Sequence, residues 1–91
     1  MRSQLLAARA AALFASDLSA ESRPSTDTVH ATIAATVRAR GGTRGCAAEM
    51  AAAYGDCPQT AMARIRWARD TVLTAYGARR PEPGTTLALA A

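Results

Sequence analysis

Few side chains in this sequence are of the types that carry catalysis or bind metals. They are one histidine, two cysteines and seven carboxylates. Cys46 and Cys57 lie eleven residues apart, and a structural zinc site needs four ligands, which His30 cannot complete. No paired carboxylates at helical spacing and no glycine-rich phosphate loop are present. We therefore expect a non-enzymatic protein without metal or cofactor, with Cys46 as a small buried residue and His30 at a surface or edge.

The arginines offer a second kind of chemistry, which is electrostatic. The formal net charge is +4, and the chain has no lysine. Residues 1–63 hold six arginines against five acidic residues, whereas residues 64–80 hold five arginines against Asp70 alone. A local excess of positive charge attracts a phosphate backbone. The location of the charge therefore predicts a contact with DNA.

A helix-turn-helix pattern surrounds the start of this basic stretch. Ala51 lies four residues before Gly55, and a small residue there would let two helices cross closely. The glycine would supply a turn with positive φ. Pro58 suits the first position of the next helix, where its missing N–H would be unpaired anyway. We expect a helix-turn-helix over about residues 46–76, with its turn at Gly55.

Residues 46–72 resemble region 4 of sigma-70-type factors, especially the extracytoplasmic-function group. The residues in register are Met50, Ala51, Gly55, Thr60, Arg64, Ile65, Ala68 and Arg69, and the departures are Asp56 and Trp67. The resemblance covers about twenty residues of region 4 and no region 2. It implies regulation of transcription, with DNA and RNA polymerase as partners. The residues that would lie against DNA are Gln59, Thr60, Met62, Ala63, Arg64, Arg66 and Arg69.

Trp67 leaves an alternative function open. The core side of the last helix is expected to carry Ala61, Ile65, Ala68 and Val72, and Trp67 points away from that side. We expect the first helix to cover the indole through Leu13 or Phe14. Alternatively, Trp67 anchors a protein partner or a second copy in a homodimer, since tryptophan is enriched at binding hot spots. The chain would then be a helical protein–protein interaction module.

The surrounding sequence predicts an all-α domain over residues 1–77. Alanine, the best helix former, makes up about a quarter of the chain, and no segment alternates like a strand. One face of the first helix is marked by Leu6, Leu13, Phe14 and Leu18. The four expected helices run from Gln4 to about Ser19, from Ser25 or Thr26 to Arg40, from Thr43 or Gly45 to Tyr54, and from Pro58 to Gly77, with Gly41-Gly42 ending the second.

The remaining residues, 78–91, are expected to form a disordered tail because prolines and glycines interrupt them. Their end, Leu89-Ala90-Ala91, resembles the end of the bacterial trans-translation tag, which implies recognition by a protease. The alternative is an alanine-rich tail in an alanine-rich chain. No segment approaches the ~20 apolar residues of a membrane span, and the N-terminus lacks the leucine core of a signal peptide. We expect a cytoplasmic protein.

Overall fold

The computed structural model describes residues 2–77, and within them the chain is all-α, as predicted. Its helices are α1 (Arg2–Ala15), α2 (Thr26–Ala39), α3 (Thr43–Asp56) and α4 (Pro58–Gly77). Over the same residues there is no strand, and no helix is long and apolar enough to cross a membrane. The predicted tail and its Leu89-Ala90-Ala91 end lie outside the described residues.

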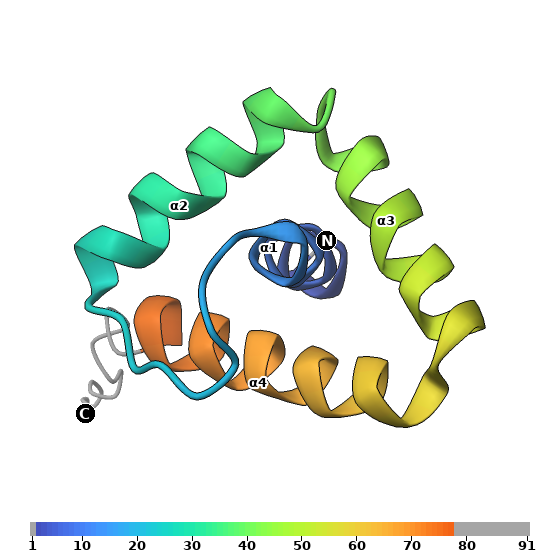
Figure 1. The fold of residues 1–91 in the computed structure, drawn as a ribbon. Coiled ribbons are helices and arrows are strands. Elements are labelled where there is room, and N and C mark those ends of the chain that lie inside the picture. The colour runs from blue at the N-terminus through green and yellow to red at the C-terminus, as the bar shows by residue number, and fades with distance from the viewer. Residues whose placement is uncertain (1, 78–91) are drawn as a thin grey trace.

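Helix α1 runs through the middle of the molecule. Figure 1 looks along this helix and shows α2, α3 and α4 as three sides of a triangle around it. Six successive residues, Ala10 to Ala15, are buried. Since a helix turns once in 3.6 residues, six in a row cover every side of it. The sequence indicated one buried face for this helix, but its second half has no solvent-facing side.

The core joins all four helices through small side chains. The largest fully buried ones are Leu13, Val29, Cys46 and Val72, one from each helix. Between α1 and α3 the buried cluster is built from Ala11, Ala12, Ala15 and Cys46. The distance between two packed helices depends on the side chains at their contact, so this alanine-rich contact favours a close approach. On α4 the predicted core side is confirmed, with Ala61, Ala68 and Val72 buried and Ile65 half-buried.

The ends of α1 and α2 are set by local hydrogen bonds. Ser25 caps α2, since its Oγ accepts a hydrogen bond from the Thr28 N–H at 3.2 Å. Gly41 and Gly42 end that helix with φ angles of 78° and 97°, as predicted. Helix α1 begins at Arg2 and ends at Ala15, four residues before the predicted end. Its last turn is tightened by the Ser16 Oγ and N–H, which both donate to the Leu13 carbonyl, at 2.6 and 3.1 Å.

The predicted turn at Gly55 is wrong. Helix α3 continues through this glycine to Asp56, and Cys57 alone separates it from α4. Among the described residues, the glycines with positive φ are Gly41 and Gly42. A helix-turn-helix usually has a turn of three or four residues. The helix-turn-helix arrangement of α3 and α4 therefore remains a prediction.

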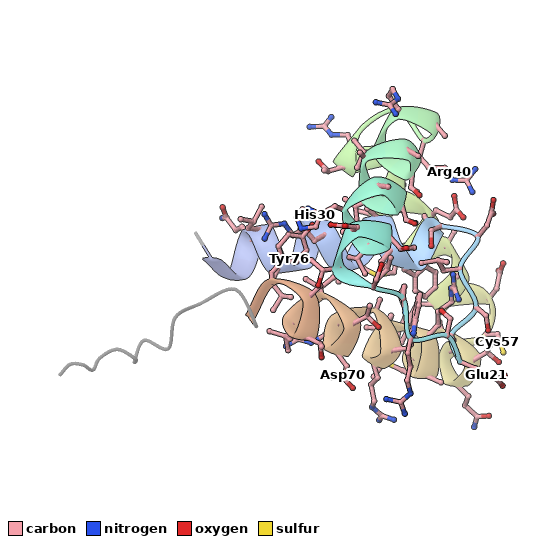
Figure 2. All side chains as sticks on the ribbon, turned by 90° about the vertical axis from the view of Figure 1, so that its left-hand side faces the viewer. Glu21, His30, Arg40, Cys57, Asp70 and Tyr76 are labelled. Carbon is pink, nitrogen blue, oxygen red and sulfur yellow. The ribbon has the colours of Figure 1, made fainter. Side chains whose placement is uncertain are left out.

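The side chain of Tyr76 on α4 contacts both α1 and α2. The Arg9 guanidinium on α1 lies 3.8 Å from the centre of the Tyr76 ring on α4. The Tyr76 hydroxyl is 3.3 Å from Nδ1 of His30 on α2, and Figure 2 shows these two side chains together. His30 is half-buried, at the edge of the core. It contributes to the packing of α2 against α4.

The close approach at the start of α3 gives a matched pair of glycine substitutions. A Cβ on Gly45 would collide with the Arg40 carbonyl oxygen, whereas a Cβ on Gly55 would meet no atom within 4 Å. We expect Gly45→Ala to lower the free energy of unfolding by about 1–3 kcal/mol, the usual cost of forced overpacking. Gly55→Ala should raise it by about 0.4–1 kcal/mol, because alanine restricts the unfolded chain. Urea denaturation followed by circular dichroism measures both, and equal effects would contradict this account.

Candidate nucleic-acid interface

The outward face of α4 carries most of the residues predicted to lie against DNA. Six of the seven are exposed, namely Gln59, Thr60, Met62, Ala63, Arg66 and Arg69. Helix α4 begins at Pro58, as predicted, and buries the opposite side against α1. Residues three and four apart are neighbours on a helix, so Met62, Arg66 and Arg69 lie on one side of it.

The guanidinium groups of Arg66 and Arg69 have no bonding partner within residues 2–77. Over this part of the chain, the ion pair formed is Arg40 with Glu49, at 3.1 Å between Nε and Oε1. Asp70 is also exposed on α4, four residues after Arg66, but makes no ion pair with it. Both guanidinium groups are therefore available to an anionic ligand.

Arg64, the seventh predicted residue, is directed into the protein. Its Nε donates a hydrogen bond to the Phe14 carbonyl and one terminal nitrogen donates to the Ser16 carbonyl, both at 2.9 Å. The guanidinium carbon also lies 5.0 Å from the centre of the Trp67 ring. Burial lowers the pKa of Arg64, although a guanidinium stays charged in proteins. In this structure the guanidinium of Arg64 binds the end of α1, so it is not among the exposed arginines of α4.

Arg40 binds the same end of α1 from the end of α2. One terminal nitrogen donates to the Ala15 carbonyl at 3.0 Å, while Nε pairs with Glu49. With the bonds of Ser16 and Arg64, the carbonyls of residues 13–16 all accept hydrogen bonds. The last carbonyls of a helix lack partners within it and carry partial negative charge. Two cations, the exposed Arg40 and the half-buried Arg64, therefore cap the end of α1.

Trp67 is half-buried and takes part in the packing of the protein. It lies against the core cluster that contains Leu13 and Phe14, as the sequence suggested. Its indole N–H donates to the Ser22 carbonyl in the α1–α2 connection at 3.1 Å. The indole also lines an open groove of about 360 Å³ between that connection and α4. The sequence analysis missed this groove, because no local pattern brings residues 20–26 beside α4.

The two cysteines occupy contrasting environments, and both are free. Cys46 is buried, as predicted, and desolvation raises the pKa of its thiol. Cys57 is exposed just before α4, and its Sγ lies 3.2 Å from the Thr60 hydroxyl. This hydrogen bond lowers the pKa of the Cys57 thiol. Over residues 2–77, no three His, Cys, Asp or Glu side chains are grouped so as to hold a metal ion.

Comparison with protein families, curated proteins and solved structures finds no match to this chain. The resemblance of residues 46–72 to sigma region 4 therefore remains a prediction.

The two environments of the α4 arginines predict different effects on stability. Arg64→Met should lower the free energy of unfolding by about 1.5–3 kcal/mol, because it leaves the Phe14 and Ser16 carbonyls without a charged donor. Arg66→Met, the matched control, should change it by less than about 0.5 kcal/mol, as is usual for surface substitutions. Denaturant titration of the two variants compares them. An equally mild effect of both would show that the bonds of Arg64 to the end of α1 do not contribute to stability.

The thiols predict a difference in reactivity with pH. Iodoacetamide reacts with the thiolate, so Cys57 should be labelled first, and Cys46 only when the protein opens. Because hydrogen bonding to Thr60 lowers the pKa of Cys57, its rate should rise at lower pH than that of a free cysteine. Thr60→Val should move the midpoint of this pH profile upwards. Mass spectrometry of timed samples measures the rate, and an unmoved midpoint would exclude an effect of Thr60.

Proposed function

We propose that the protein binds DNA through the exposed face of α4 and acts as a non-enzymatic regulator of transcription. The observation that carries the proposal is that Arg66 and Arg69 extend from this face with no ion pair among the described residues. Arginine donors of this kind bind phosphate oxygens and the edges of guanine.

The other exposed residues of α4 support the same use. Gln59 and Thr60 stand in its first turn, where side chains and backbone N–H groups commonly contact DNA phosphates. In a helix-turn-helix interpretation, α4 would be the helix that enters the major groove. At about 1.5 Å per residue its 20 residues extend for about 30 Å, close to one turn of DNA. RNA polymerase would be a protein partner of such a regulator.

The test is binding to a pool of duplex DNA, followed by fluorescence anisotropy at several salt concentrations. Affinity should fall as salt rises, because phosphate contacts release counterions. Arg66→Ala and Arg69→Ala should each reduce the slope of log affinity against log salt by about 1. Arg38→Ala removes an exposed arginine from α2 and should leave the slope unchanged. No binding at low salt, or an equal effect of all three variants, would reject the proposal.

A second candidate function is protein–protein interaction through Trp67. It is supported by the groove that the indole lines beside α4. A pull-down from host lysate with and without nuclease separates the two functions. A single protein partner that survives nuclease, with no DNA retained at low salt, would favour the interaction module.

A further inference from the structure

The groove beside Trp67 is lined by both apolar and charged side chains. Pro24 and the Trp67 indole give it an apolar part, and Glu21 and Asp70 give it two carboxylates. Figure 2 shows these two acidic residues on the same side of the molecule, next to α4. Neither carboxylate forms an ion pair among residues 2–77, and the one cation in the lining, Arg23, forms none there either. Grooves lined by aromatic residues are a common way to bind proline-rich peptides, which are extended before they bind.

A segment of this chain complements that lining. Residues 79–83, just after the end of α4, read Arg-Arg-Pro-Glu-Pro. Two cations and one carboxylate in the segment match two carboxylates and one cation in the groove. We propose that this groove binds residues 79–83 of the same chain, with the arginines towards Asp70 and the prolines towards Trp67, in the negative field of both carboxylates. The inference uses the groove and the sequence after Gly77, and it does not depend on DNA binding.

The reach of the segment after Gly77 is compatible with the length of the groove along α4. The α4 residues that line the groove run from Ala75 back to Trp67. From Gly77, Asp70 is about 10 Å back along the helix axis and Trp67 about 15 Å, at about 1.5 Å per residue. If the segment is extended, it covers about 3.1 Å per residue, so residue 80 would come level with Asp70 and residues 81–83 with Trp67. Arg80 would thus reach Asp70 and the prolines would reach Trp67, beside which Ser22 and therefore Glu21 lie.

The chain has a single tryptophan, so its indole reports on the groove without labelling. The experiment is a nitrogen–proton correlation spectrum of the full-length protein, in which Trp67 gives one side-chain peak. Arg79→Ala with Arg80→Ala should shift this peak, and Pro81→Gly with Pro83→Gly should shift it in the same direction. The matched control is Arg38→Ala with Arg44→Ala, which removes the same charge from exposed positions outside the groove and should leave the peak in place.

Two further measurements test whether the segment contacts Trp67, Glu21 and Asp70 in the groove. Nuclear Overhauser effects are expected between the Trp67 ring and the protons of Pro81 or Pro83. With Glu21→Gln and Asp70→Asn already present, the arginine changes should shift the Trp67 peak little further, since the two sets of charges act on each other. The proposal is overturned if the tail variants leave the peak unmoved or if no such Overhauser effects are found. It is equally overturned if the shift depends on protein concentration, because the bound segment would then belong to a second copy.

Discussion

The buried end of α1 is the constraint on which the rest of the structure depends. The last carbonyl groups of a helix lack partners within it, and each one that is buried and left unpaired costs stability. Here Arg40 and Arg64 donate to these carbonyls from the end of α2 and from α4. The same contacts set the rotation of α4 about its axis. Residues two apart on a helix point about 200° from each other, so Arg66 faces outward because Arg64 faces inward.

The packing around α1 relies on small residues more than on large ones. Alanines occupy four of its six successive buried positions, and α3 meets them through Cys46. Gly45 has no room for a Cβ beside the Arg40 carbonyl, and that carbonyl belongs to a residue that also caps α1. The cap of α1 and the turn between α2 and α3 therefore both depend on Arg40. Small side chains at these contacts allow α2, α3 and α4 to pack closely around α1.

Helix α4 serves two surfaces that do not coincide. Its outward side presents Arg66 and Arg69, and a neighbouring side forms the groove with the α1–α2 connection. The hydrogen bond from Trp67 to Ser22 holds that connection in place, so the groove is a product of tertiary packing. The two surfaces adjoin on α4, because Asp70 in the groove stands four residues after Arg66.

Local sequence features were sufficient to predict the helical class, most helix boundaries and the core side of α4. Alanine content, the Ser25 cap and Gly41-Gly42 act over a few residues, so local physics is sufficient to predict them. It also indicated which α4 residues are exposed, apart from Arg64. Tertiary structure decided the role of that arginine, because its acceptors lie 48 and 50 residues away. It also decided that α1 is central and that α3 passes through Gly55, since a glycine can continue a helix when packing on its neighbours outweighs its low propensity.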